Sequence, residues 1–268
     1  MTAPATVPQT QPSERDGVRV EIDGEIARVT LCEPEHRNAQ SPAMWRALAA
    51  AGRDLPGTVR VVVLRAEGLS FSAGLDRAMF TVEGLPGERN FLQLAAAEDE
   101  DVDETIAGFQ EAFTWWRRPD LISIAAVQGH AVGAGFQLAL GCDLRVVADD
   151  VQFSMRETSL GLVPDLAGTK PLTELVGYAR ALEICVTGRR VGAEEAVAVG
   201  LANLAVPAAE LDGAVHDLAA ALLAAPRNAV IETKALLQGA GGRSYDEQRS
   251  AERVAQARRM RDLAGIGD

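Results

Sequence analysis

The sequence predicts an α/β fold that ends in a purely helical region. Short apolar runs rich in β-branched residues recur through the first part of the chain, as is typical of buried strands. At two places such a run turns through glycines, and after the second turn Phe136–Gly141 has the apolar spacing of a helix. From about Val206 or Pro207 onward only helical patterns occur. We therefore expect a core over residues 17–206 and a helical region over residues 207–268.

A β-hairpin and a capped helix are expected near the start of this core. Val18–Ile22 and Ile26–Leu31 flank Asp23-Gly24, a dipeptide that favours hairpin turns. Further along, Ser41 is a typical helix N-cap, and Pro42 suits the first helical position.

Two strand-to-glycine turns dominate the middle of the chain. Arg60–Leu64 leads into Leu69–Asp76 (LSFSAGLD), and Ile122–Val127 leads into GHAVGAG at residues 129–135. A turn from a strand into a helix leaves unpaired N–H groups that can hold a negatively charged oxygen, although it can also be a plain corner without a ligand. Two such donors aimed at one point would form an oxyanion hole, which needs no catalytic side chain.

The remaining elements are assigned in the same way. An apolar stripe at helical spacing runs from Val102 to Trp116, which is typical of core and could also line an apolar pocket. The acidic cluster Glu98–Glu104 is more typical of a solvated face than of a cation site. Ser244 and Glu247 form a capping-box pattern for the last helix. Further strands are expected at Asp143–Ala148 and Val151–Phe153, and further helices at Ala181–Val186, Ala193–Val199, Ala208–Ala224 and Arg227–Gln238.

Composition excludes several classes of protein. The chain has 268 residues and a net charge of −12, which argues against nucleic acid as a partner. No apolar run is long enough to span a membrane, and residues 1–16, rich in Pro, Thr and Gln, predict a disordered tail rather than a signal peptide. The three cysteines lie far apart and form no metal-binding pattern, which favours free thiols in a reducing compartment. We therefore expect a soluble, cytoplasmic protein without a metal site.

Several motifs in a fixed order make the chain resemble the crotonase superfamily, also called the enoyl-CoA hydratase/isomerase family. The resemblance covers most of residues 18–203 and is more specific than any single glycine motif. Its motifs are RNA with a later Met (Arg37–Met44), VVVLRAEGLSFSAGLD (Val61–Asp76), IAAVQGHAVGAGFQLALGCDLRVVADD (Ile124–Asp150), Phe-x-x-x-Glu (Phe153–Glu157), LGLVPDLAGT (Leu160–Thr169) and TGRRVGAEEAVAVGLAN (Thr187–Asn203).

The resemblance implies a spiral of short β–β–α turns, followed by helices that assemble trimers, often pairs of trimers. It also implies an acyl-CoA substrate, with coenzyme A as part of that substrate and no other cofactor. The thioester carbonyl is expected between the backbone N–H groups of Leu75 and Ala134. The adenine is expected near the backbone of Ala73–Asp76, and the CoA phosphates near Arg37, unless that residue is an ordinary surface arginine. The expected substrate-binding residues are Arg37, Ala39, Ala73, Gly74, Asp76 and Gly133.

The resemblance also indicates acid–base residues, and here the chain departs from hydratases of the family. Those enzymes use two glutamates, whose positions fall on Gln137 and Glu157. Glutamine neither takes nor gives a proton at neutral pH. Moving a double bond needs only one base, so we expect an isomerase in which Glu157 carries the proton, unless it is a surface or ion-paired glutamate. Asp165 lies where relatives resembling dienoyl-CoA isomerase have an aspartate, but it could equally bond its own backbone in a turn.

Three alternatives remain open from the sequence. Asp165 could replace the missing acid in a hydratase, together with Glu157. The chain could instead bind acyl-CoA with little turnover, because one expected acid is absent. A peptidase is disfavoured, because the sequence has neither a GxSxG motif nor a Ser/His pair placed by a motif.

Overall fold

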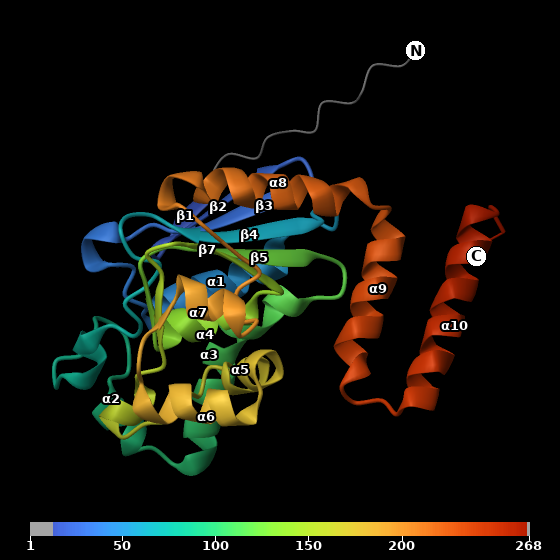
Figure 1. The fold of residues 1–268 in the computed structure, drawn as a ribbon. Coiled ribbons are helices and arrows are strands. Elements are labelled where there is room, and N and C mark those ends of the chain that lie inside the picture. The colour runs from blue at the N-terminus through green and yellow to red at the C-terminus, as the bar shows by residue number, and fades with distance from the viewer. Residues whose placement is uncertain (1–12, 267–268) are drawn as a thin grey trace.

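The structure, a computed structural model, describes residues 13–266 and is organised around a seven-stranded sheet (Figure 1). The strand order is β1-β2-β3-β4-β5-β7-β10. β1, β2 and β3 pair antiparallel, whereas β3 to β10 pair parallel. The predicted hairpin is confirmed, with Gly24 and Glu25 between the paired Asp23 and Ile26. The strands are β1 (Ser13–Arg15), β2 (Val18–Asp23), β3 (Ile26–Leu31), β4 (Val61–Ala66), β5 (Ile122–Val127), β7 (Leu144–Ala148) and β10 (Leu204–Val206).

Alternating side chains along the central strands bury both faces of this sheet. On β4, Val62 and Leu64 face the main core, whereas Val61 and Val63 face a second cluster formed with α8 (Leu211–Ala224). Successive residues of a strand point to opposite faces, so an uninterrupted apolar run is what a sheet covered on both sides requires. Figure 1 shows α8 along one face of the sheet, with α1 and α4 beneath the other.

The main core lies between the sheet and α1 (Pro42–Asp54), α3 (Asp99–Thr114) and α4 (Ala134–Gly141). Ser41 caps α1 as predicted, since its Oγ accepts the N–H of Met44 at 3.2 Å. The apolar stripe predicted at Val102–Trp116 becomes core at its end, where Phe113 and Trp116 are buried. The other helices of this part are α2 (Phe91–Ala95), α5 (Thr169–Val176), α6 (Tyr178–Thr187) and α7 (Ala193–Ala198), with short 3-10 turns at Pro34–His36, Arg77–Phe80, Trp115–Arg117, Glu157–Leu160 and Ala208–Glu210.

A second, three-stranded sheet lies after the glycine turns. It consists of β6 (His130–Val132), β8 (Gln152–Ser154) and β9 (Val191–Gly192), with β6 parallel and β9 antiparallel to β8. Only β8 was expected from the sequence. β6, β9 and β10 are two or three residues long and are held by partners distant in the chain, so no local pattern marks them.

The prediction of a disordered tail over residues 1–16 is wrong for residues 13–15. These residues form β1, which pairs antiparallel with β2 from Ser13↔Val20 to Arg15↔Val18. Asp16 and Gly17 reverse the chain with positive φ values of 49° and 74°. A wholly polar strand carries no apolar alternation, which is why the pattern missed it. Residues 1–12 of the predicted tail lie outside the described residues.

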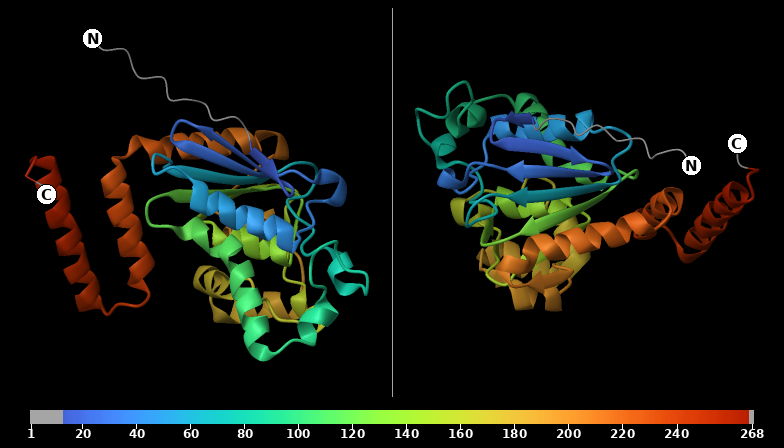
Figure 2. Two further views of the ribbon diagram at one scale, coloured as in Figure 1. Left: turned by 180° about the vertical axis from the view of Figure 1, so that it is seen from behind. Right: turned by 90° about the horizontal axis from the view of Figure 1, so that it is seen from above.

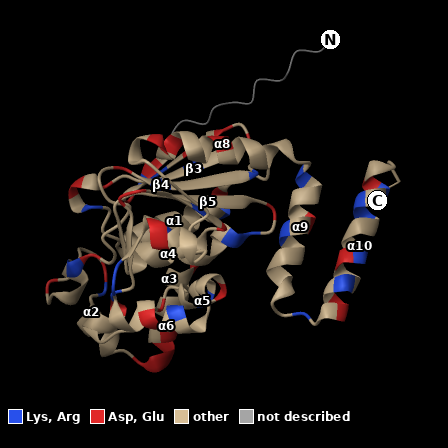
Figure 3. Ribbon diagram, in the orientation of Figure 1, with Lys and Arg blue, Asp and Glu red and all other residues tan. Residues whose placement is uncertain are grey.

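The C-terminal helices α9 (Arg227–Ala240) and α10 (Tyr245–Leu263) stand beside each other, away from the sheet (Figures 1 and 2). The predicted capping box is confirmed, because Ser244 and Glu247 bond reciprocally at the start of α10. α10 carries residues of both charges (Figure 3), and Arg258 bonds Glu232 of α9 at 2.6 Å.

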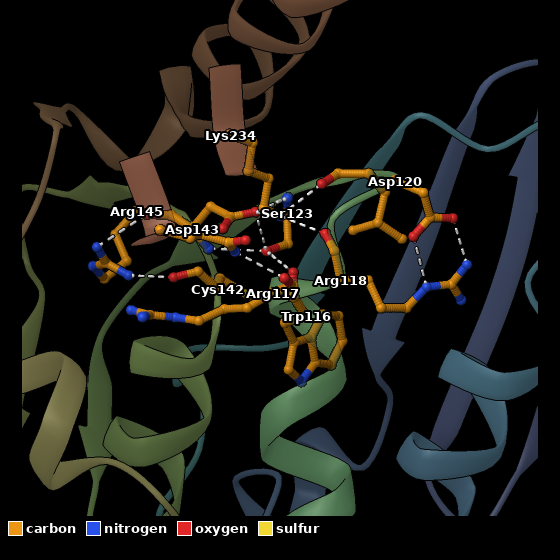
Figure 4. Close-up of polar contacts among 11 residues, drawn as sticks. Trp116, Arg117, Arg118, Asp120, Ser123, Cys142, Asp143, Arg145 and Lys234 are labelled. Atoms are coloured by element: carbon orange, nitrogen blue, oxygen red, sulfur yellow. Dashed lines mark hydrogen bonds and ion pairs between the residues drawn. The ribbon is translucent and has the colours of Figure 1, made fainter. Parts of the chain in front are cut away.

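A buried lysine attaches α9 to the core (Figure 4). Lys234 Nζ donates to the carbonyl oxygens of Arg118 and Leu121 and to Asp143 Oδ2, each at 2.7 Å. An ammonium group has three donors, so this buried charge has all its hydrogen bonds satisfied. Across residues 13–266, the structure contains no helix long and apolar enough to cross a bilayer.

Candidate active site

The first glycine corner (Leu69–Asp76) follows β4 and pairs with β6. Ser72 donates its N–H to His130 O at 2.9 Å, and its carbonyl accepts the N–H of Val132 at 3.0 Å. Gly74 has a φ of 90°, and a Cβ built on it would lie 2.6 Å from Val132 O. Only glycine allows this approach, so the glycine of the motif sets how close the corner comes to β6.

The second glycine corner (Gly129–Gly135) ends at the start of α4. Gly133 has a φ of 51° and donates its N–H to Ser154 O on β8 at 2.8 Å. Ala134 is the first residue of α4, so its N–H has no acceptor within the helix, and no side chain caps this end. Every residue of α4 is buried, and the helix N-terminus therefore opens inside the protein.

The two corners lie against each other. A Cβ on Gly74 would be 3.7 Å from Ala134 N, and a Cβ on Gly135 would be 2.7 Å from Ser72 Cβ. The segments that carry the two expected N–H donors are therefore in direct contact.

Hydrogen bonding of the first corner indicates where the N–H of Leu75 points. Leu75 forms an isolated parallel bridge with Gln40, made by Gly74 O and Asp76 N. In such a bridge the residue between the two bonded groups directs its own N–H to the opposite side. The N–H of Leu75 thus points away from Gln40 and is not used by that bridge.

Glu157 lies beside the second corner, at the start of a 3-10 turn after β8. A Cβ on Gly133 would be 3.3 Å from Glu157 Oε1, so the carboxylate sits next to the residue that precedes Ala134. Its other oxygen, Oε2, is buried and has no hydrogen-bond partner among residues 13–266. Burial raises the pKa of Glu157 and the like charge of Asp165 adds to the rise, while backbone N–H groups and the Gln137 amide oppose it.

Gln137 is locked in one orientation by the loop that follows Glu157. Its Oε1 accepts the N–H of Leu166 at 2.9 Å and that of Gly168 at 3.3 Å. Its Nε2 therefore faces Glu157 and donates to Oε1 of that residue at 2.7 Å. The side chain is buried, with 1% of its surface exposed. Gln137 orients the carboxylate and cannot exchange a proton with it.

Asp165 belongs to the same loop, and the structure brings it near Glu157. Gln110 on α3 donates its Nε2 to Asp165 O at 2.6 Å, which ties the loop to that helix. The side chain is half-buried, and burial raises the pKa of Asp165. Because the two carboxyl groups interact, the protonation of one depends on the other.

The expected substrate-binding residues lie on two adjacent segments and at the second corner. Arg37 O accepts the N–H of Ala73 at 2.9 Å, and Gly74 O accepts the N–H of Gln40 at 2.7 Å. The strip from Arg37 through Ala39 thus runs beside Ala73–Asp76, with Gly133 at the far side of Gly74. Arg37 is exposed and forms no ion pair with a described carboxylate. Asp76 is already engaged, since its Oδ1 accepts the N–H of Ala78 at 2.8 Å.

The buried polar residues beneath the first corner were not predicted from the sequence. Asn38, Gln40 and Ser72 are each 0% exposed. Asn38 Nδ2 donates to Ser70 O, Gln40 Nε2 donates to Ser72 Oγ, and Ser72 Oγ donates to Asn38 O. Their hydrogen-bond partners lie more than thirty residues away in the chain, so no local pattern marks them. Within residues 13–266 no cluster of three or more His, Cys, Asp or Glu side chains is arranged to hold a metal.

Comparisons with known proteins find relatives along most of the chain. The family model described as Enoyl-CoA hydratase/isomerase matches residues 21–262. A Thermobifida fusca YX protein with the provisional name enoyl-CoA hydratase, solved with CoA, is 49% identical, with a TM-score of 0.87, covering 93% of this chain and 95% of its own. The same protein solved with acetoacetyl-CoA is 50% identical over 92% and 95%, with a TM-score of 0.88.

Two relatives known by sequence carry different activities in their names. A Rhodobacter capsulatus protein, provisionally named enoyl-CoA hydratase, is 34% identical over 81% of this chain and 79% of its own length. The peroxisomal Delta(3,5)-Delta(2,4)-dienoyl-CoA isomerase of Arabidopsis thaliana is 29% identical over 82% and 80%.

Proposed function

The chain belongs to the enoyl-CoA hydratase/isomerase family, and we propose that it moves the double bond of an enoyl-CoA thioester with Glu157 as its only base. The crotonase fold expected from the sequence is confirmed by the solved relatives. Relatives carry both hydratase and isomerase names, so family membership leaves the reaction open. The choice between reactions rests on the carboxyl groups of this site.

An acyl-CoA thioester suits the arrangement of the two corners. The Thermobifida protein was solved with CoA and with acetoacetyl-CoA, which supports such a substrate. In our proposal the adenine lies against the backbone of Ala73–Asp76. Arg37, which is exposed and pairs with no described carboxylate, meets the phosphates. Coenzyme A enters as part of the substrate, and no further cofactor takes part.

The N–H groups of Leu75 and Ala134 then donate to the thioester oxygen. When a proton leaves the α-carbon, that oxygen becomes an enolate, and fixed donors stabilise it by about 3 kcal/mol each. The contact between the corners, with Gly74 close to Ala134 N, supports a shared acceptor for the two donors.

Glu157 performs the proton transfers in this proposal. Its carboxylate takes the proton from C2 of a 3-enoyl thioester, and the electron pair moves onto the thioester oxygen. The enolate then collapses with protonation at C4 by the same group, so that the double bond moves from C3–C4 to C2–C3. The raised pKa of Glu157 suits a group that must both accept and return a proton.

The observation that carries this proposal is the orientation of Gln137. Its oxygen is occupied by two backbone N–H groups, and its amide nitrogen donates to Glu157. The position that would hold the second acid of a hydratase is therefore an orienting group, while Glu157 Oε2 is buried and has no hydrogen-bond partner in the described part of the chain.

A hydratase that pairs Glu157 with Asp165 is the second candidate. Burial raises the pKa of Asp165, and its charge acts on Glu157, as expected for two carboxyl groups that could share a proton. The hydratase names of several relatives favour it as well. In that case Asp165 would supply the proton that Gln137 cannot.

One 3-enoyl thioester, two 2-enoyl thioesters and two variants separate these candidates. We expect wild type to convert trans-3-hexenoyl-CoA to the conjugated 2-enoyl thioester, and Glu157→Gln to lose a factor of about 100 to 10,000 in kcat. Asp165→Asn should keep most of this activity. Wild-type isomerisation rates in Glu157→Gln would refute the proposal.

Crotonyl-CoA and 2-hexenoyl-CoA test the second candidate. Hydration of either by wild type, abolished in Asp165→Asn, would establish the hydratase. Tight binding of acyl-CoA by calorimetry, without product from any of these thioesters, would instead indicate a binding protein with little turnover.

Assembly into trimers, or into dimers of trimers, is part of the same proposal. α9 and α10 stand off the sheet and expose Leu237, Val254 and Met260, which are 71%, 52% and 61% exposed. Apolar side chains on such an extension are typical of a surface that contacts another subunit. Light scattering after gel filtration gives the mass, and a monomer at micromolar concentration would contradict the proposal.

A further inference from the structure

The hydroxyl of Ser72 has every hydrogen-bonding position occupied inside the first glycine corner. Ser72 Oγ donates to Asn38 O at 2.7 Å, and it accepts the N–H of Gly74 and an amide hydrogen of Gln40, each at 3.2 Å. A hydroxyl offers one donor and two acceptor sites, so these three bonds fix its orientation. The Gly74 N–H that it holds belongs to the residue before Leu75.

This hydroxyl is tied to the main core through Gln40. Gln40 Oε1 accepts the indole N–H of Trp45 at 2.8 Å, and Gln40 Nε2 donates to Ser72. Trp45 lies on α1 and is 4% exposed, packed against Phe109 and Phe113 of α3. The first corner is thus held by a chain of buried hydrogen bonds that ends on a rigid helix.

Ser72 also touches the second glycine corner. Its backbone bonds His130 and Val132 on β6 at 2.9 and 3.0 Å. On its other side, a Cβ on Gly135 would lie 2.7 Å from Ser72 Cβ and 2.9 Å from Ser72 Oγ. One residue therefore contacts the corner that carries Leu75 and the helix that begins at Ala134.

We infer that Ser72, held by Gln40, is a positioning residue that sets the spacing and direction of the Leu75 and Ala134 N–H groups. The inference rests on the proposed function, because it concerns how the same oxyanion hole is built. Ser72 itself does not reach the substrate and acts through the two backbone segments that it joins.

Removing the hydroxyl should harm transition-state stabilisation more than binding. Ser72→Ala leaves the buried N–H of Gly74 and the buried side-chain amide of Gln40 without an acceptor. The first corner would shift as these two donors find other partners. Displacement of a catalytic donor by about 1 Å costs up to a hundredfold in rate. We expect kcat to fall by about tenfold to a hundredfold, with KM within about threefold of wild type.

Ser123→Ala is the matched control. Ser123 is also 0% exposed and donates its hydroxyl to Trp116 O at 2.7 Å (Figure 4). It lies at the start of β5, however, whereas the second glycine corner follows the end of that strand. Loss of its hydroxyl should lower the melting temperature and leave kcat unchanged. Comparison of the two variants separates a positioning effect from general destabilisation.

The readout specific to the oxyanion hole is the ionisation of bound acetoacetyl-CoA. Wild type should lower the pKa of its C2 proton, seen as near-ultraviolet absorbance of the enolate. Ser72→Ala should raise this bound-state pKa by roughly one to two units, while the affinity for CoA itself stays the same. Ser123→Ala should match wild type.

The outcomes are distinct. A Ser72→Ala protein with wild-type kcat and wild-type enolate absorbance overturns the inference and leaves the proposed function intact. A wild-type protein that neither ionises acetoacetyl-CoA nor isomerises any enoyl-CoA overturns the proposed function, and the inference with it. If Ser72→Ala does not fold, Ser72→Cys, whose sulfur accepts hydrogen bonds weakly, serves with Ser123→Cys as control, and the same two results decide.

Discussion

The hydrogen bond from Gln137 should set the pH at which Glu157 becomes an active base. Gln137 Nε2 donates to Glu157 Oε1 at 2.7 Å, which favours the charged carboxylate. A hydrogen bond to a charged group contributes about 1.5–3 kcal/mol, equivalent to roughly one to two pKa units. Gln137→Met removes the donor at nearly the same side-chain length. We therefore expect the acid limb of kcat/KM to move to higher pH by that amount.

Gln137→Glu is the companion variant and should move the limb further. It keeps an oxygen for the N–H groups of Leu166 and Gly168 but places a second carboxylate against Glu157. Like charges about 4 Å apart repel by about 4 kcal/mol at an effective dielectric of about 20, or roughly three pKa units. Glu157 and the introduced carboxyl group titrate as a coupled pair, and the second of their two protons should be lost at a pH higher than the wild-type pKa of Glu157.

The assay is the pH profile of kcat/KM for trans-3-hexenoyl-CoA. The reaction is monitored through the absorbance of the conjugated product. Thermal melting at each pH shows whether a variant unfolds because it has lost the contacts that Gln137 makes with the loop. The apparent pKa of the acid limb should rise in the order wild type, Gln137→Met, Gln137→Glu. A Gln137→Met limb within about 0.3 units of wild type, or at lower pH, would refute the reasoning.

Three further substitutions test individual contacts. Gly133→Ala would place a Cβ 3.3 Å from Glu157 Oε1, on a residue whose φ of 51° disfavours a side chain. We expect kcat to fall by roughly tenfold or more while CoA still binds. An unchanged kcat would contradict this placement of the carboxylate. Asp165→Asn removes a like charge, so the acid limb set by Glu157 should move to lower pH, and a move to higher pH would be inconsistent with the coupling. Lys234→Met leaves Asp143 without its ion-pair partner and should cost about 3–5 kcal/mol of unfolding free energy in urea; a loss under about 1 kcal/mol would show that this attachment of α9 contributes little.

The two glycine corners could be predicted because their signal is local. Gly74 and Gly133 stand where the backbone needs a positive φ or a close approach, and sequence shows such residues directly. The long helices could be predicted for the same reason, since apolar spacing and caps lie within one segment. β1 was missed because its polar residues carry no such pattern.

The acid–base arrangement could be predicted only in part. The sequence places an amide at Gln137 and a carboxylate at Glu157, but it cannot show which end of the amide faces the carboxylate. That orientation is decided by the N–H groups of Leu166 and Gly168, residues about thirty positions away that only the folded loop brings near. The contacts of Ser72 with Gln40 and Gly135 are likewise invisible in the sequence, because only the fold brings these residues together.

The origin of the hydrogen at C4 of the product tests the central claim most directly. trans-3-Hexenoyl-CoA deuterated at C2 is isomerised for a single turnover, and the product is analysed for deuterium at C4. Glu157 Oε2 is buried and bonded to no described residue. The deuteron that this carboxyl group takes from C2 should therefore exchange slowly with water, and part of the deuterium should reappear at C4. A product whose C4 hydrogen comes entirely from solvent would contradict proton transfer by a Glu157 carboxyl group that is shielded from water.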